Sequence, residues 1–327
     1  MQKKIGVMEE PALDLNLSVM DELEKIGFLL REQYQKHGFS RYRMSKFEEY
    51  DLYSRNKDFL LSDSVITFMD PSGRLLALKP DVTLSIVKNI RDCGEDIRKL
   101  YYHENVYRVL AGTDEFREET QVGVECMGRV DYTTLSEIIM LALTSLQILN
   151  INCILEISHL DILGAAVDSV STDISIRNRI LECVEHKNAH GIREICVSEG
   201  LNTSSAEPLL HLMSLDGSPG KVLTDVRNIA REIGCEKYAD SLEKILDPLM
   251  NSSYENHLLI DFSTTGDLKY YNGLVMKGFI EGIPDPVLSG GQYDKLMHRM
   301  GRKDRAVGFA VFLNRLERMN QEGGWLG

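Results

Sequence analysis

"YYHENVYRVLAGTDEFREETQVGVECMG", residues 101–128, is the stretch that decides the fold. Two strand-like runs, 99–110 and 117–128, flank a short connection that contains Gly112, so we predict an antiparallel hairpin. Alternate side chains of the second strand fall on opposite faces. The apolar face carries Val122, Val124 and Cys126. The polar face carries Glu119, Gln121, Gly123 and Glu125. This polar face is either solvated or the floor of a pocket.

The segments before this hairpin predict a mixture of helix and strand. Apolar spacing predicts a helix over 18–37, capped by Ser18 and ended by Gly38. Residues 65–78 predict another hairpin, because two apolar runs flank the turn sequence DPSG. Residues 80–90 predict a short helix with a proline near its start.

The segments after the hairpin change character near residue 165. A helix is predicted over 133–149 and a strand over 153–160, and apolar spacing is helical throughout 166–254. Strand character returns in "HLLIDFS" and "LKYYNGLVMKGFI". The stretch "SGGQYDKLMHRMG" predicts a glycine-rich turn before a short helix, and "AVGFAVFLNRLERM" predicts a strand that runs into a final helix.

Strands joined mostly by hairpins, with helices in blocks, predict an α+β fold: an antiparallel sheet flanked by helices, with a helical insertion. We expect residues 1–165 and 255–327 to form one discontinuous core. Residues 166–254 form the mainly helical insertion of this division.

Composition limits the functions that are open to the chain. The formal net charge of −13 over 327 residues argues against a broad nucleic-acid-binding surface, which needs clusters of Lys and Arg. The six cysteines form no CxxC pair, so we expect reduced thiols and no metal site. The N-terminus lacks the apolar region of a signal peptide, and no apolar run approaches ~18 residues. We therefore expect a cytoplasmic protein without a membrane span.

Several polar residues on predicted sheet elements have simple structural explanations when each is taken alone. Asp81 could be a carboxylate at a helix N-terminus, and Arg108 could form a surface ion pair of little energetic value. Tyr270 and Tyr271 could be one core and one surface residue. The glycine pair at 290–291 could be a tight turn.

Together and in this order, the motifs resemble the catalytic core of a class II aminoacyl-tRNA synthetase of the histidyl type. The stretch 101–128 resembles motif 2 with its following strand, and "AVGFAVFLNRLERM" resembles motif 3. The stretches "LALKPDVT" and "LKYYNG" resemble two signatures of the histidyl type. The resemblance covers residues 15–164 and 255–320.

The resemblance implies a pocket for L-histidine. The positions that match the family's ligand contacts are Asp81, Thr83, Gln121, Glu125, Tyr270 and Tyr271. These residue types suit the ligand, because a cationic amino group needs carboxylate and hydroxyl acceptors and an imidazole needs a carboxylate or phenol at each nitrogen. Gly123 is expected to leave room for the ligand above the strand.

The nucleotide half of the site departs from the family pattern. Arg108, Arg117 and Arg315 match nucleotide-site arginines, and we interpret them as vestiges. The acidic residue expected after the motif 2 arginine is absent, and Gly266 replaces an arginine that helps to activate the carboxylate. Further departures are Ser45 in motif 1 and Phe312 and Asn314 in motif 3. Because phosphoryl chemistry depends on cationic groups placed at the phosphates, we expect no catalytic residues and no cofactor.

This pattern resembles the regulatory-subunit family of ATP phosphoribosyltransferase in histidine biosynthesis. The chain ends at Gly327, so we expect no anticodon-binding domain. The resemblance implies a non-catalytic subunit that forms dimers within a hetero-octamer. It would activate a short-form catalytic subunit and make that subunit sensitive to histidine by allostery.

Two alternatives stay open. The chain could be a divergent or truncated histidyl-tRNA synthetase-like enzyme that activates an amino acid with ATP. It could also be a binding module or dimeric scaffold with an empty pocket. ATP–pyrophosphate exchange distinguishes the first alternative from a regulatory subunit.

Overall fold

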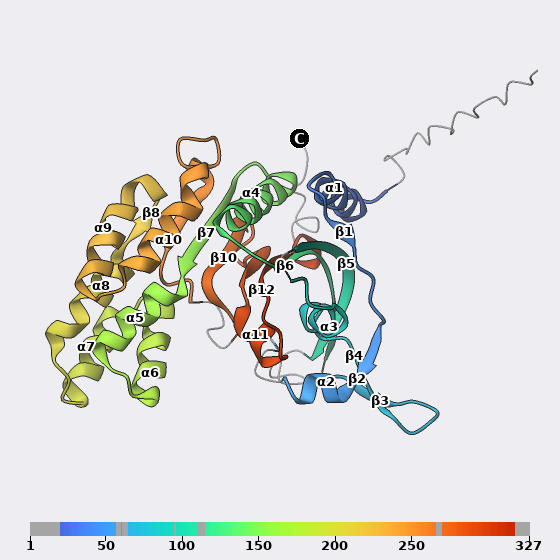
Figure 1. The fold of residues 1–327 in the computed structure, drawn as a ribbon, viewed down its shortest axis with the longest axis horizontal. Helices are drawn as coiled ribbons and strands as arrows, with labels where there is room; N and C mark the ends of the chain where they lie inside the picture. Colours follow the sequence, from blue (N-terminus) through green and yellow to red (C-terminus); the bar gives the residue numbers. More distant parts are fainter. Residues whose placement is uncertain are drawn as a thin grey trace, which may run out of the picture.

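A nine-stranded mixed sheet forms the centre of the molecule (Figure 1). The computed structural model describes residues 20–56, 60, 65–94, 96–109, 115–265 and 270–317. The strand order is β1-β5-β6-β12-β11-β10-β7-β9-β8. The pairs β1/β5 and β7/β9 are parallel and the other neighbours are antiparallel. The α+β fold with flanking helices is confirmed, although the sheet is mixed rather than purely antiparallel.

Strands β5, β6, β7, β9, β10 and β12 lie close to the predicted positions, whereas β1, β8 and β11 are strands that the sequence did not predict. Their bounds are β1 Ser40–Arg41, β5 Ile97–Val109, β6 Phe116–Gly128, β7 Cys153–His159, β8 Asp216–Gly217, β9 Leu258–Asp261, β10 Asn272–Ile280, β11 Leu288–Gln292 and β12 Arg305–Phe312. The long hairpin β5/β6 is confirmed, with Cα partners from Ile97↔Gly128 to Val109↔Phe116. The predicted connection around Gly112 lies outside the described residues.

A three-stranded sheet at the edge of the molecule confirms the predicted hairpin over 65–78 (Figure 1). Its strands are β2 Phe47–Glu49, β3 Thr67–Met69 and β4 Leu75–Leu78. The Asp70 carboxylate accepts the backbone N–H groups of Ser72 and Arg74 at 2.9 Å each. Gly73 has a φ of +82°, a conformation that glycine adopts without strain. The turn chemistry therefore sets this hairpin.

Two predictions about local structure are wrong. The N-cap of α1 (Glu22–Lys36) is Asp21, whose side chain forms a capping box with Glu24, so the helix begins later than a Ser18 cap would place it. Gly290 and Gly291 form no turn; they lie inside β11. A Cβ at Gly290 would overlap with the backbone of β12, so this pair allows two strands to approach closely.

Helices cover both faces of the large sheet. The core helices are α1, α2 Tyr50–Ser54, α3 Thr83–Asn89, α4 Tyr132–Leu149 and α11 Asp294–Arg299. Helices α1 and α4 pack on the face that carries Val122, Val124 and Cys126. Helices α3 and α11 contribute side chains to a second apolar cluster, which holds Leu100, Tyr102 and Met127 from the other face.

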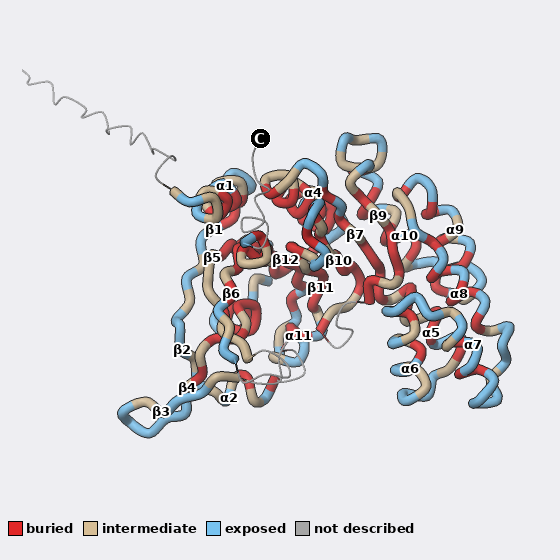
Figure 2. The backbone as a smooth tube through the Cα atoms, turned by 180° about the vertical axis from the view of Figure 1, so that it is seen from behind, coloured by how far each residue is buried: buried red, intermediate tan, exposed pale blue. Residues whose placement is uncertain are grey.

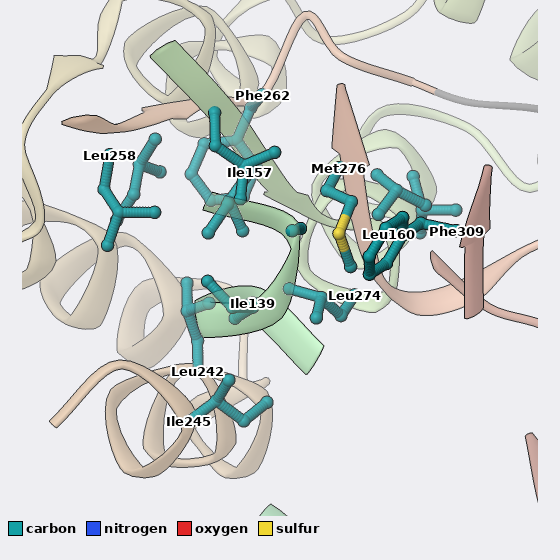
Figure 3. Close-up of a cluster of buried hydrophobic side chains, with 14 of the residues drawn as sticks. Ile139, Ile157, Leu160, Leu242, Ile245, Leu258, Phe262, Leu274, Met276 and Phe309 are labelled. Carbon is teal, nitrogen blue, oxygen red and sulfur yellow. The ribbon is translucent and has the colours of Figure 1, made fainter. Parts of the chain in front are cut away.

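The larger apolar cluster joins the sheet to its neighbouring helices. Ile139 of α4, Ile157 of β7 and Leu274 of β10 meet in this cluster (Figure 3). Helix α4 is the one helix in the described part of the chain that is long and apolar enough to cross a membrane. Because 61% of its residues are buried within the protein, it has the burial of a core helix.

The segment between β7 and β9 holds six α-helices, three short 3-10 helices and the two-residue strand β8, joined by short turns and loops. Its α-helices are α5 Leu160–Val170, α6 Ile174–Glu185, α7 Ala189–Ser198, α8 Glu207–Ser214, α9 Pro219–Glu232 and α10 Glu236–Leu246. They stand beside the end of the sheet, with exposed outer surfaces (Figure 2). Helix α5 runs through residues 165 and 166, so the predicted division there would cut a helix. That division remains a prediction.

Candidate functional site

A cavity of 530 Å³ opens on the sheet face that carries Gln121 and Glu125. All six residues predicted to bind histidine line it: Asp81, Thr83, Gln121, Glu125, Tyr270 and Tyr271. The polar face of β6 is not solvated, because Glu119, Gln121 and Glu125 are all buried. Of the two interpretations of this strand, the pocket floor is the one that the structure shows.

Glu125 is a buried residue of the cavity floor. Thr83 Oγ1 donates to Glu125 Oε1 at 2.6 Å, and the Tyr293 hydroxyl donates to Glu125 Oε2 at 2.6 Å. Burial raises the pKa of Glu125 to about 8, although both hydrogen bonds oppose that shift. The site therefore holds a buried carboxyl that a cationic ligand group would ionise.

Asp81 combines a structural contact with a place in the cavity wall. Its Oδ1 accepts the Leu84 N–H at 2.8 Å, in the first turn of α3. Burial raises the pKa of Asp81, while the Leu84 N–H and the Arg108 charge oppose the shift. The alternative explanation of Asp81 as a helix N-terminal carboxylate is thus correct without removing Asp81 from the cavity.

Three tyrosines form one wall of the cavity. The Tyr270 and Tyr271 rings meet edge to face at 4.6 Å between centroids, and Tyr270 lies 6.0 Å from the Tyr293 ring. Burial raises the pKa values of Tyr270 and Tyr293, so both phenols stay neutral. Neutral phenols can each donate one hydrogen bond to a ligand or to a carboxylate.

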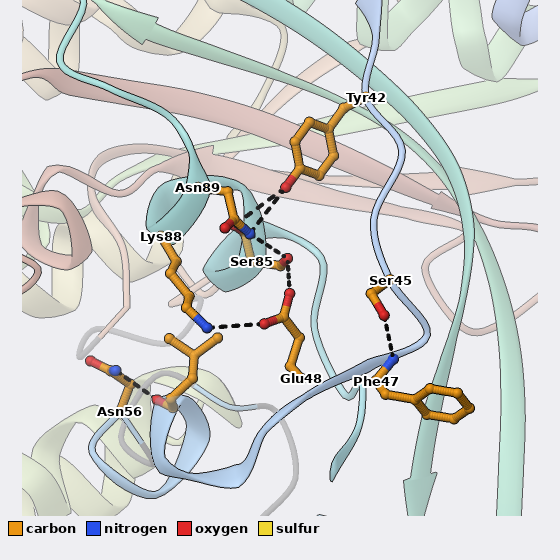
Figure 4. A network of polar contacts seen from close by, with 9 residues as sticks. Tyr42, Ser45, Phe47, Glu48, Asn56, Ser85, Lys88 and Asn89 are labelled. Carbon is orange, nitrogen blue, oxygen red and sulfur yellow. Dashed lines mark hydrogen bonds and ion pairs between the residues drawn. The ribbon is translucent and has the colours of Figure 1, made fainter. Parts of the chain in front are cut away.

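Helix α3, which carries Thr83, is tied to the small sheet by a polar network (Figure 4). Glu48 of β2 accepts from the Ser85 hydroxyl at 2.9 Å and from Lys88 Nζ at 3.0 Å. Asn89 donates to the Ser85 carbonyl oxygen at 2.9 Å. These contacts fix helix α3, and with it Thr83 in the cavity, to strand β2 of the three-stranded sheet.

The glycines of the floor make room for side chains. A Cβ at Gly123 would overlap with the Tyr102 hydroxyl, and a Cβ at Gly308 would overlap with Glu125 Oε2. The expectation that Gly123 leaves open space for a ligand is therefore wrong, because the Tyr102 side chain occupies that space. In the same way, the absence of a side chain at Gly308 leaves the space that the Glu125 carboxyl group occupies.

Two of the three predicted nucleotide-site arginines, Arg108 and Arg315, form ion pairs with Glu119. Arg108 Nη1 lies 3.0 Å from Glu119 Oε2, and Arg315 Nε lies 3.8 Å from Glu119 Oε1. Arg117 is the Cα partner of Arg108 across the hairpin. Of these three arginines, Arg108 lines the cavity. Phe312 also lines the cavity and stacks under the Arg315 guanidinium at 4.1 Å.

Sequence reasoning missed several lining residues. They are Tyr102, Asn178, Glu185, Lys277, Ser289, Tyr293, Phe309 and Ala310. Tyr293 was visible in the glycine-rich stretch "SGGQYD", but nothing in that pattern indicates that its hydroxyl reaches β6. Asn178 and Glu185 come from α6, so a helix between β7 and β9 also faces this cavity.

Two other expectations concern Gly266 and a metal site. Gly266, which replaces the family's carboxylate-activating arginine, lies outside the described residues. Among those described, no group of three or more His, Cys, Asp or Glu residues could hold a metal ion. The side chains of the cavity suit a small polar ligand with a cationic group.

Comparison with known sequences identifies related proteins. A family profile described as histidyl-tRNA synthetase matches residues 13–316. Two relatives are both named ATP phosphoribosyltransferase regulatory subunit. The protein of Alkaliphilus metalliredigens is 25% identical, over 88% of this chain and 74% of its own. The protein of Clostridium kluyveri is 29% identical, over 86% of this chain and 74% of its own.

Solved structures show the same fold. An ATP phosphoribosyltransferase regulatory subunit/histidyl-tRNA synthetase from Bacillus halodurans superposes with a TM-score of 0.77 at 23% identity, over 96% of this chain and 84% of the other. A chain of the ATP phosphoribosyl transferase (HisG:HisZ) complex from Thermotoga maritima superposes with a TM-score of 0.64 at 18% identity. The superposition covers 90% of this chain and 98% of the other.

Proposed function

The chain belongs to the histidyl-tRNA synthetase family, and from that premise we propose that it is the regulatory subunit of an ATP phosphoribosyltransferase in histidine biosynthesis. The relatives that share this name align with most of the chain. It is a non-catalytic subunit that activates a catalytic partner.

The ligand of the cavity is L-histidine. The observation that carries this assignment is the gathering of Asp81, Gln121, Glu125 and Tyr270 around one cavity. Two buried carboxyl groups can receive the ligand's ammonium group, and neutral phenols and the Gln121 amide can bond its imidazole. Histidine bound here would lower the activity of the assembly only if it binds two states with different affinity.

The alternative of a divergent synthetase has less support from the site. A synthetase needs cationic groups free to meet the nucleotide phosphates. Here Arg108 and Arg315 share the Glu119 carboxylate, and the Arg315 guanidinium also donates to the Pro286 carbonyl oxygen. ATP–pyrophosphate exchange with histidine tests this alternative directly, and we expect no exchange above background.

The partner is a catalytic subunit of the short form, which lacks its own regulatory domain. We place the assembly in the cytoplasm and expect dimers of this chain within a hetero-octamer. Co-purification with the short catalytic subunit from the same organism tests the pairing. We expect one stable peak in size-exclusion chromatography that contains both chains, and two separate peaks would contradict the proposed function.

A further inference from the structure

The arginine end of the cavity carries a charge arrangement that histidine binding does not explain. Arg108, Arg117 and Glu119 project from the same face of the β5/β6 hairpin, because 108 and 117 are directly paired and 117 and 119 are two residues apart. Like charges directly opposite each other on paired strands are destabilising. A carboxylate beside them offsets that cost.

Glu119 is placed to fill this role. One oxygen meets Arg108 at 3.0 Å and accepts from Gln121 Nε2 at 3.2 Å, and the other lies 3.8 Å from Arg315. The Glu119 side chain is 10% exposed, so these pairs are poorly screened by solvent. Glu119 therefore links β5 and the turn after β12 through a single buried anion.

Phosphate groups and carboxylates compete for the same guanidinium geometry. Both offer oxygens that accept the paired N–H groups of arginine. Neutralising Glu119 would remove the carboxylate that Arg108 and Arg315 share, and the positive charges of Arg108 and Arg117 already act on Arg315. Such a cluster is a strong site for a polyphosphate anion.

We propose that Glu119 is an internal anion that excludes phosphate-bearing ligands from this pocket; that a free amino acid then fills the pocket rests on the proposed function. The Glu119 carboxylate already occupies the position beside Arg108 and Arg315 that a phosphate group would take, and Phe312, which lines the cavity, stacks on the Arg315 guanidinium. Glu119 is thus a specificity-determining residue that acts by occupying the cation cluster.

Titration calorimetry with sodium pyrophosphate tests this role without histidine or the catalytic partner, so it is independent of the proposed function. Glu119→Gln should bind pyrophosphate at least about tenfold more tightly than the wild-type chain. The arginines that pair with Glu119 would then form a charge-assisted hydrogen bond with pyrophosphate instead. Glu118→Gln is the matched control: it removes the same charge one residue away, where Glu118 is exposed and contacts Tyr107 at 3.3 Å.

A second variant identifies where the anion binds. Adding Arg315→Met to Glu119→Gln should abolish the gain in affinity. If Glu119→Gln fails to fold, Glu119→Asp replaces it. Asp keeps the charge but is one methylene shorter, so its carboxylate lies farther from Arg108 and Arg315. We expect a smaller gain in pyrophosphate affinity for this variant. Wild-type affinity equal to that of the folded variant, an equal gain in Glu118→Gln, or a gain that survives Arg315→Met would each overturn the proposal.

Discussion

Tyr293 donates its phenolic hydrogen to Glu125 Oε2 over 2.6 Å, and this bond joins the residue after β11 to the C-terminal part of β6. The other Glu125 oxygen is bonded by Thr83. Both contacts come from neutral hydroxyl groups, which fix the position of the carboxyl without supplying a positive charge. The two hydroxyl groups thus fix the position of the Glu125 carboxyl, and a cationic ligand would supply the positive charge that the site lacks there.

The first prediction concerns the pH dependence of stability. The pKa of Glu125 is about 8 in the folded chain, whereas a carboxyl in an unfolded chain titrates near ~4.3. Between these values the folded state keeps a proton that the unfolded state has lost. The Glu125 contribution to stability is therefore present at low pH and is lost as pH rises toward 8.

Glu125→Gln isolates this effect because glutamine does not titrate. The free energy of unfolding of the variant minus that of the wild-type chain should rise between pH 5 and 8, by up to roughly 1.4 kcal/mol per pH unit. Urea titrations at several pH values measure this difference. A difference that is independent of pH would show that Glu125 is not held protonated.

The second prediction concerns the Tyr293 hydroxyl. Tyr293→Phe leaves a buried carboxyl oxygen without its donor, which should lower the free energy of unfolding by about 1–3 kcal/mol. Tyr107→Phe is the matched control, since its hydroxyl meets the exposed Glu118 at 3.3 Å. We expect the control to stay within about 0.5 kcal/mol of the wild-type chain. Equal effects of the two changes would contradict a special role for Tyr293.

The third prediction concerns the glycine under Glu125. Gly308→Ala would place a methyl group on Glu125 Oε2, so we expect a destabilised chain with weakened histidine binding. Gly164→Ala adds the same methyl group within α5, where no atom lies within 4 Å, and should be neutral or stabilising by up to about 1 kcal/mol. Thermal unfolding and calorimetry of both variants check this contrast.

The fourth prediction concerns proton release. A bound ammonium group favours the ionised form of Glu125, so histidine binding at pH 7 should release up to about one proton from this carboxyl. Calorimetry in two buffers with different ionisation enthalpies measures that release. Glu125→Gln should bind histidine more weakly and release less. An unchanged affinity and unchanged proton release would remove Glu125 from the ligand's contacts.

Much of the fold could be predicted from local sequence patterns. The DPSG turn, the alternation in β6 and the apolar spacing of α1 each specify an element without help from distant residues. The glycine pair in β11 could not be interpreted in this way. A glycine pair fits a turn as well as a strand, and only the neighbouring β12 backbone decides between them.

The candidate site was predicted through family resemblance more than through local pattern. Gln121 and Glu125 stand out because they are polar on a strand with an apolar opposite face. Tyr293 and Lys277 could not be found in this way, since their place in the cavity depends on how β10 and β11 pair with distant strands. The bridge between Arg108, Glu119 and Arg315 likewise joins residues that are far apart in sequence.

The rate of phosphoribosyl transfer by the short catalytic subunit tests the central claim most directly. It is measured for the catalytic subunit alone, with an equimolar amount of this chain, and with both this chain and L-histidine. We predict that the chain raises the rate and that histidine lowers it again. A catalytic subunit whose rate is the same in all three mixtures would contradict the account.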